Sequence, residues 1–348
     1  MTAGLAEDAA DLRPKIESFE TKGKGDATKY ALGCLAEVPP QYTEISLRDG
    51  KRVADQLTGQ SEFPVLTRLQ GSVPLNIHIY ASSDVDLLIL ANWFVSVKLP
   101  VVTPGAYKFD TGPSSMVDEL HRLRSFCEQY LPTKYPAADV DITGAKSIAV
   151  SGGSLARKVD VVPSHWVDTV EYQRTKVEIH RDVAILEKEK KETLTNRPFM
   201  HMAMIDHKDA SSAGQAKRAI RLLKCLSRDA DAVIALSSYD IAGLIFHMPD
   251  AELSVNPFFP LQLLDRVELY LRRLESNITW AMSLQTPDGT RTILDSSAKA
   301  FAVSQLRQEL TDAIDNVAAE YDATIPFIFD RGRARETARK TLSETLIY

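Results

Sequence analysis

Residues 69–90 read LQGSVPLNIHIYASSDVDLLIL, and this stretch decides the fold. Asp84 and Asp86 stand at the entrance to an apolar run over 85–90, which is typical of a strand that is buried on both faces. Because residues two apart in a strand point to the same face, the two carboxylates are predicted to project together. Like charges at the rim of a core repel each other, so the pattern indicates that a cation normally shares the site.

A third carboxylate and a small-residue turn complete the pattern. Asp160 enters a second short apolar run, 159–162, which Pro163 closes. Three strand-borne carboxylates can hold two Mg²⁺ ions, or Mn²⁺ in their place, about 3.5–4 Å apart for phosphoryl transfer. Gly71 and Ser72 form a turn that could receive a triphosphate, provided that a helix precedes or follows it. The structural alternative is that Asp-x-Asp and Gly-Ser pairs also occur in ordinary turns.

The composition is that of a globular protein and restricts the possible partners. The 348 residues are 44% hydrophobic and 25% charged, and this length predicts two domains or one elaborated domain. The formal net charge of −6 disfavours an extended nucleic-acid partner, because such partners require many Lys and Arg side chains. No apolar run approaches the ~20 residues of a membrane span, so no membrane partner is expected. The polar N-terminus and three scattered cysteines without CxxC spacing fit a reducing cytoplasm.

The first part of the chain mixes helices and strands. Helices broken at Pro39–Pro40 are expected over 1–60, because two prolines end helical pairing. Further strands are expected near 147–151 and 159–162, and apolar residues at helical intervals predict an amphipathic helix over 115–130. These elements favour an α+β core.

The charged segment 186–198 is read as a solvated strand end or turn, and it marks a domain boundary near Asn196. Before it, the Pro/Gly-rich stretch 99–113 is expected to be a surface loop. Beyond the boundary the sequence has a helical period almost throughout. We therefore predict a mixed α+β domain with N-terminal helices over 1–195 and a helical domain over 196–348.

Three motifs occur together in this order: GS at 71–72, SDVDLLIL at 83–90 and RKVDVVPSHW at 157–166. As a set they resemble the CD-NTases, the cyclic oligonucleotide synthases of bacterial antiphage (CBASS) signalling that are related to cyclic GMP-AMP synthase. Small antitoxin-type nucleotidyltransferases differ, because their third carboxylate follows the first pair much more closely. The resemblance implies a polymerase-β-like nucleotidyltransferase core over 1–195, with 196–348 completing the nucleotide site.

The resemblance also implies nucleotide-binding roles in the helical part. The segment GQAKRAIRLLKCLSRDADAVIALSSYDIAGL, 214–244, is similar to the one with which this family contacts the donor nucleotide. By this similarity Lys224 meets the triphosphate, Ser238 hydrogen-bonds a phosphate and Tyr239 stacks on the base. Read without the family, Lys224 is equally an exposed helix residue, and Tyr239 is equally a core aromatic.

The implied activity is the condensation of purine nucleoside triphosphates, ATP and GTP, into a cyclic di- or trinucleotide messenger. A ribose hydroxyl, polarised by Mg²⁺ and by Asp160 as ligand or base, would attack the α-phosphate. Two alternatives stay open: a template-independent RNA-tailing nucleotidyltransferase, which should need a basic tract, and a catalytically silent nucleotide sensor. The intact set of Asp84, Asp86 and Asp160 argues against the silent sensor. A regulatory partner or effector encoded elsewhere is compatible with this function.

Three features carry no site prediction of their own. The loop VPLNIHIYAS, 73–82, is short of Arg and Lys, so we expect it to contact the acceptor base rather than its phosphates. The C-terminus TLSETLIY, 341–348, lacks a terminal Gly, so conjugation through the tail is not expected. His201 and His207 are lone histidines, which are usually structural rather than metal ligands.

Overall fold

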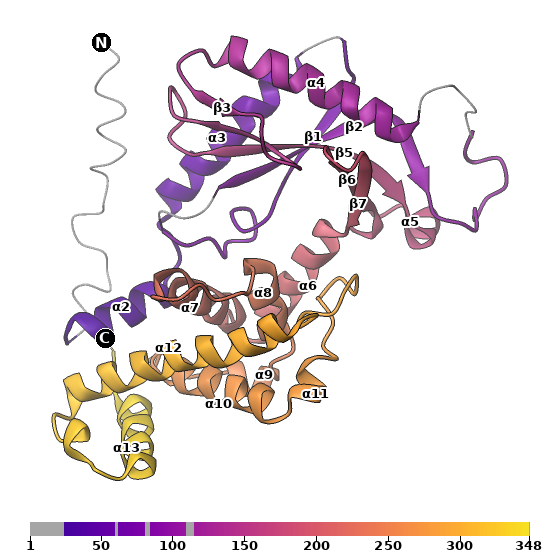
Figure 1. Cartoon of the computed structure of the whole chain (residues 1–348). Coiled ribbons are helices and arrows are strands. Elements are labelled where there is room, and N and C mark those ends of the chain that lie inside the picture. Colours follow the sequence, from indigo (N-terminus) through magenta and orange to yellow (C-terminus); the bar gives the residue numbers. More distant parts are fainter. Residues whose placement is uncertain (1–23, 60–61, 81–83, 109–114, 348) are drawn as a thin grey trace. The chain divides into compact units, whose positions relative to one another are not determined.

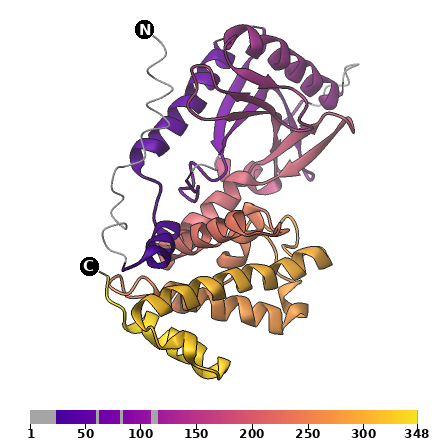
Figure 2. The same ribbon diagram turned by 60° about the vertical axis from the view of Figure 1, so that its left-hand side comes forward.

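The computed structural model describes residues 24–59, 62–80, 84–108 and 115–347 (Figures 1 and 2). The helices expected before residue 24, and the portions of the predicted loops at 81–83 and 109–113, lie outside the described residues.

The described residues form two compact units. The first unit holds 38–76 and 80–203. The second holds the residues up to Glu37, the short segment 77–79 and the chain from Met204 onward. The predicted assignment of functions to 1–195 and 196–348 stays a prediction.

A mixed sheet forms the centre of the first unit (Figure 1). Its strands are ordered β1-β2-β5-β4-β3, and β6 pairs with both β5 and β7. β2 and β5 run parallel, whereas the other pairs are antiparallel. The strands are β1 (Val65–Gln70), β2 (Val85–Val97), β3 (Asp139–Asp141), β4 (Ile148–Ser151), β5 (Val159–Asp168), β6 (Asp182–Glu187) and β7 (Glu192–Asn196).

The two faces of this sheet have separate apolar cores. Val85 and Leu87 lie in the core that β2 and β5 share with α3 (Pro40–Thr58) and α4 (Met116–Lys134). Leu88 and Leu90 lie in the other core, together with Trp166. β2 is therefore apolar on both faces, as the unbroken run predicts. This double burial fixes the register, because a slip of one residue would exchange the side chains of the two cores.

The predicted elements of the first unit are largely confirmed. The amphipathic helix is α4, and Ser115 caps it in a capping box with Asp118. The break at Pro39–Pro40 is also present: α2 (Asp26–Leu35) ends before it and α3 begins at Pro40, whose missing N–H is harmless in the first turn. The segment after β5 adds α5 (Val170–Thr175) and η1 (Glu178–His180).

The second unit consists of helices, in agreement with the predicted helical period, and the α+β fold class is confirmed. α10, α12 and α13 pack against one another, and α2 packs against α7 and α12 (Figures 1 and 2). None of the helices in the described ranges has the length and apolarity that crossing a membrane requires. The helices are α6 (Pro198–Ser211), which begins in the first unit, α7 (Gln215–Asp229), α8 (Ser238–Phe246), α9 (Asp250–Leu253), α10 (Gln262–Ser276), α11 (Ile278–Ala281), α12 (Ser297–Tyr321), η2 (Ile325–Phe327) and α13 (Arg331–Glu344).

Candidate active site

The three predicted carboxylates gather at the start of the two parallel strands. Asp86 on β2 and Asp160 on β5 are direct register partners, so their side chains lie side by side on one face of the sheet. Asp84 precedes Val85, the first residue of β2. We refer to Asp84, Asp86 and Asp160 as the acidic row.

Lys158 is the cation that neutralises part of the acidic row. Its Nζ lies 2.8 Å from Oδ2 of Asp84 and 3.4 Å from Oδ2 of Asp160. The Asp84 side chain is 46% exposed, whereas that of Asp160 is 16% exposed. Burial raises the pKa of Asp160, and the Asp84 charge adds to this rise against the opposing effect of Lys158. The row is therefore acidic and only partly compensated.

Gly71 fits against the acidic row in a way that other residues cannot. It follows β1, has a φ of +82°, and a Cβ atom at this position would overlap Oδ2 of Asp86. Glycine satisfies both demands, because it accepts a positive φ and has no side chain. The predicted Gly71–Ser72 turn is thus present beside a carboxylate. The expected neighbouring helix is not: residues 72–76 form turns that contain Pro74 and a positive φ at Asn76.

A buried aspartate on α3 holds the loop that leads into β5. Asp49 is fully buried, and its Oδ2 accepts hydrogen bonds from the backbone N–H groups of Ala156 (2.7 Å) and Arg157 (3.0 Å). One turn later Arg52 donates to the carbonyl of Ser154 at 2.7 Å. These bonds fix the backbone immediately before Lys158 and the third carboxylate.

Sequence reasoning did not identify this support, although one signal for it exists. An Asp-Gly pair in the middle of a helix is unfavourable and needs a packing reason. A Cβ atom on Gly50 would lie 2.7 Å from Cγ1 of Val85 and 3.0 Å from Leu69, so glycine lets α3 pack tightly against the sheet beside the acidic row.

Lys224, in the second unit, is buried and points to the chain rather than to solvent. Its Nζ donates to the carbonyl of Ile77 at 2.8 Å. The alternative of an exposed helix residue is therefore wrong. The triphosphate role stays a prediction.

Ser238 and Tyr239 open helix α8 in the second unit. Ser237 is the N-cap and forms a capping box with Asp240, so Ser238 is exposed in the first turn, where N–H groups lack partners within the helix. The Tyr239 ring is half-buried, with the guanidinium of Arg291 5.6 Å from its centroid. Burial and a hydrogen bond with Asp288 raise the pKa of its hydroxyl. The phosphate and base roles of these two residues stay predictions.

The chemistry of the acidic row fits a hard divalent cation. Its donors are carboxylate oxygens, which Mg²⁺ prefers, and a cationic ammonium already bridges two of them. Within the described ranges, no three His, Cys, Asp or Glu side chains are grouped so that they could hold a metal ion as they stand.

Comparison with known proteins gives consistent matches over most of the chain. No protein-family model matches it. It is 37% identical over 320 residues to the cyclic dinucleotide synthase CdnE of Yersinia aleksiciae, covering 91% of this chain and 83% of the relative. It is 28% identical over 255 residues to a c-di-GMP synthase of a Lachnospiraceae bacterium, covering 65% of this chain and 70% of the relative.

A solved structure agrees with these relatives. The structure of the STING-associated CdnE c-di-GMP synthase of Capnocytophaga granulosa superimposes with a TM-score of 0.70 at 26% identity. The match covers 90% of this chain and 92% of that one. Together with the 37% identity to the Yersinia protein, it shows that the chain belongs to the CdnE-type cyclic dinucleotide synthases of the CD-NTase family, which are nucleotidyltransferases.

Proposed function

We propose that this enzyme joins two purine nucleoside triphosphates into a cyclic dinucleotide. GTP is the favoured substrate, and ATP is the alternative. The observation that carries the proposal is the acidic row, in which Asp86 and Asp160 face each other across parallel strands while Gly71 lies against Asp86. Adjacent carboxylates on rigid strands are suited to phosphoryl transfer, which depends on positioning and charge stabilisation.

Asp84, Asp86 and Asp160 would hold the divalent ions, Mg²⁺ or Mn²⁺. When bound, these ions would polarise the phosphate and neutralise the leaving pyrophosphate. Asp160 would orient the attacking ribose hydroxyl, either as a metal ligand or as the base that accepts its proton. Within the described residues no helix adjoins the Gly71–Ser72 turn, so the turn itself would bring backbone N–H groups and the Ser72 hydroxyl to the phosphates.

The second unit would supply the remaining contacts to the nucleotide. Ser238 would donate to a phosphate from the first turn of α8, where the helix dipole favours an anion. Tyr239 would stack on the purine, and the neighbouring Arg291 would hold the ring in place. Lys224 would add a charge-assisted contact to the triphosphate.

The relatives support the choice of product. The Lachnospiraceae and Capnocytophaga proteins are c-di-GMP synthases, and the latter is STING-associated. We therefore favour c-di-GMP as the messenger, with an antiphage effector as its receiver. A trinucleotide, the other product size that the sequence allows, is the less favoured outcome.

A product assay with a matched variant tests this proposal. Purified enzyme is incubated with labelled GTP, ATP or both, with Mg²⁺ or Mn²⁺, and the products are resolved after phosphatase treatment. We expect a phosphatase-resistant cyclic dinucleotide. Asp84→Asn combined with Asp86→Asn should reduce pyrophosphate release by about a thousandfold, because the loss of metal ligands removes several kcal/mol of transition-state stabilisation.

The control is Asp55→Asn on α3, which removes an exposed carboxylate that only pairs with Lys51 at 3.3 Å. It should leave turnover unchanged. Unchanged turnover in the double variant would exclude the assigned carboxylates. A ladder of phosphatase-sensitive linear oligomers, or extension of added RNA, would show a tailing nucleotidyltransferase instead.

A further inference from the structure

Lys158 occupies the place in the acidic row where a metal ion would be expected. It lies two residues before Asp160 on the chain, and its Nζ reaches Oδ2 of Asp84 at 2.8 Å and Oδ2 of Asp160 at 3.4 Å. A lysine ammonium carries one positive charge at neutral pH. One monovalent cation thus ties a residue at the entrance of β2 to a residue of β5.

The position of Lys158 is set by the fold rather than by chance contact. The loop before it is held by the buried Asp49, which accepts from the N–H groups of Ala156 and Arg157. The carbonyl of Lys158 in turn accepts a hydrogen bond from the N–H of Val85 at 3.0 Å. The backbone of this lysine is therefore fixed next to both aspartates, while its side chain is 39% exposed and can turn toward solvent.

We propose that Lys158 is a resident counter-cation, which neutralises Asp84 and Asp160 in the metal-free enzyme and has to be displaced when divalent metal binds. The proposal rests on the metal-binding role proposed above for these carboxylates. Both cations would draw on the same two carboxylates, Asp84 and Asp160, so they compete for the same negative charge. Lysine suits this role because its ammonium is a point charge on a flexible four-carbon stem.

Displacement couples metal loading to the nucleotide. Without nucleotide, a divalent ion competes with a covalently attached ammonium and binds weakly. A nucleoside triphosphate brings several negative charges, which can accept the released ammonium and also contribute ligands to the metal. By thermodynamic linkage, nucleotide then raises the affinity for metal, and metal raises the affinity for nucleotide by the same factor. The enzyme would thus load metal together with its substrate.

Metal binding in the absence of nucleotide tests this role directly. Mn²⁺ affinity of the full chain is measured by electron paramagnetic resonance, without any turnover, for the wild type, Lys158→Met and Lys158→Gln. We expect both neutral variants to bind Mn²⁺ about tenfold more tightly, because they lose a competing charge next to the ligands. Lys158→Arg keeps the charge and should bind like the wild type. Lys190→Met is the matched control, because Lys190 pairs with Glu187 at 2.8 Å on the β6–β7 turn of the same unit.

A second measurement separates displacement from a general change in the fold. Thermal unfolding in EDTA should give the neutral variants a melting temperature a few degrees below that of the wild type, and Mg²⁺ should raise it more in the variants. Equal Mn²⁺ affinity in wild type, Lys158→Met and Lys158→Gln would overturn the proposal, and so would weaker binding in the variants. When Asp84→Asn and Asp160→Asn are added to a neutral Lys158 variant, its higher Mn²⁺ affinity should disappear. If the higher affinity remained, the proposal would also be overturned. The proposed function is tested separately by the product assay, where it fails if turnover survives the loss of Asp84 and Asp86.

Discussion

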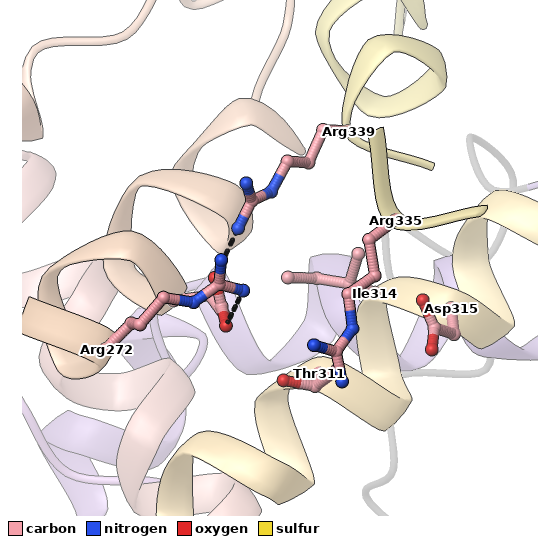
Figure 3. Close-up of a pocket in the computed structure, with 7 residues that line it drawn as sticks. Arg272, Thr311, Ile314, Asp315, Arg335 and Arg339 are labelled. Atoms are coloured by element: carbon pink, nitrogen blue, oxygen red, sulfur yellow. Dashed lines mark hydrogen bonds and ion pairs between the residues drawn. The ribbon is translucent and has the colours of Figure 1, made fainter. Parts of the chain in front are cut away.

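Two groups of charged side chains in this molecule have opposite electrostatic balance. In the first unit, the acidic row has three carboxylates, and Lys158 pairs with two of them, Asp84 and Asp160. In the second unit, the carboxylate of Glu268 on α10 is 2% exposed and forms ion pairs with three arginines. Two of these arginines, Arg272 and Arg339, are labelled in Figure 3. Arg272 and Arg339 each lie 2.7 Å from the carboxylate, and Arg307 lies 3.2 Å away. The acidic row has one lysine for its carboxylates, whereas Glu268 has three arginine partners, two of which also pair with Asp265 or Glu275.

The pKa directions follow this difference. Burial alone raises the pKa of a carboxylate, and at Glu268 the contacts with Arg272, Arg339 and Arg307 reverse that effect, so its pKa is lowered. At Asp160 a single lysine does not reverse it, and the pKa is raised. The Glu268 group stabilises the fold by joining α10, α12 and α13. The acidic row does not favour folding, because burial and the neighbouring charge disfavour the ionised form of Asp160. Such arrangements are typical of functional sites.

Neutralising one carboxylate in each group is the most direct test of this difference in stability. Glu268→Gln should reduce the free energy of unfolding by about 3 kcal/mol, because a buried position loses its charge-assisted contacts with three partly exposed arginines. Asp160→Asn should change it by less than about 1 kcal/mol, or raise it slightly, since its pair with Lys158 is partly exposed and the ionised form is disfavoured. Urea unfolding of the two variants provides the measurement.

Glu252→Gln serves as the control, because Glu252 pairs with Arg273 at 2.9 Å in a more exposed place of the same unit. It should cost at most about 1 kcal/mol. A loss in Asp160→Asn as large as that in Glu268→Gln would mean that the acidic row also stabilises the fold.

The support from α3 provides a second, smaller test. Asp49→Ala should cost about 1.5–3 kcal/mol of unfolding free energy, because the N–H groups of Ala156 and Arg157 lose a charged acceptor. It should also lower kcat more than it changes KM, since the backbone before Asp160 loses its anchor. Asp55→Ala, on the exposed face of the same helix, should do neither. If Asp49→Ala lowered the unfolding free energy but left kcat unchanged, Asp49 would stabilise the fold without positioning the site.

The smallest expected effect is on the pH dependence of stability. The pKa of Glu268 lies below its ordinary value of 4.5, so its contribution is fully present above that pH and is lost as pH falls through the folded-state pKa. The stability gap between wild type and Glu268→Gln should therefore narrow below about pH 4.5. Urea unfolding of both proteins at intervals from pH 7 down to pH 3.5 would measure this narrowing. A difference in unfolding free energy that stayed constant with pH would show that the ionised Glu268 is not its cause.

The sequence predicts the acidic row because its signal is local. Asp86 and Asp160 each enter an apolar run, and two such runs pair in a core with little freedom of register. β1 was not predicted, because all six of its residues are only partly buried at the sheet edge and show no alternation. The charged stretch 186–198 contains the end of β6 and a turn, as predicted, but it also contains β7, whose alternation its charged residues conceal.

The contacts that depend on distant segments could not be predicted. The arginines around Glu268 come from three helices, α10, α12 and α13, and no spacing rule connects them. Lys224 lies 147 positions after Ile77, whose carbonyl it binds, so nothing near it in the sequence distinguishes burial from exposure. Asp49 is likewise separated by more than 100 positions from the backbone that it holds.

The bond from Lys224 to Ile77 also has a consequence for dissecting the protein into fragments. The helical unit recruits α2 and 77–79 from earlier in the chain, and Arg221 donates to the carbonyl of Leu35 at 3.1 Å within it. A truncated polypeptide beginning at the predicted boundary of residue 196 would lack all of these partners. It would present a buried lysine, a buried arginine and the apolar side of α7 to water. Coexpression with a separate N-terminal peptide, or a circular permutation that keeps these segments attached, is therefore the better route to an isolated helical unit.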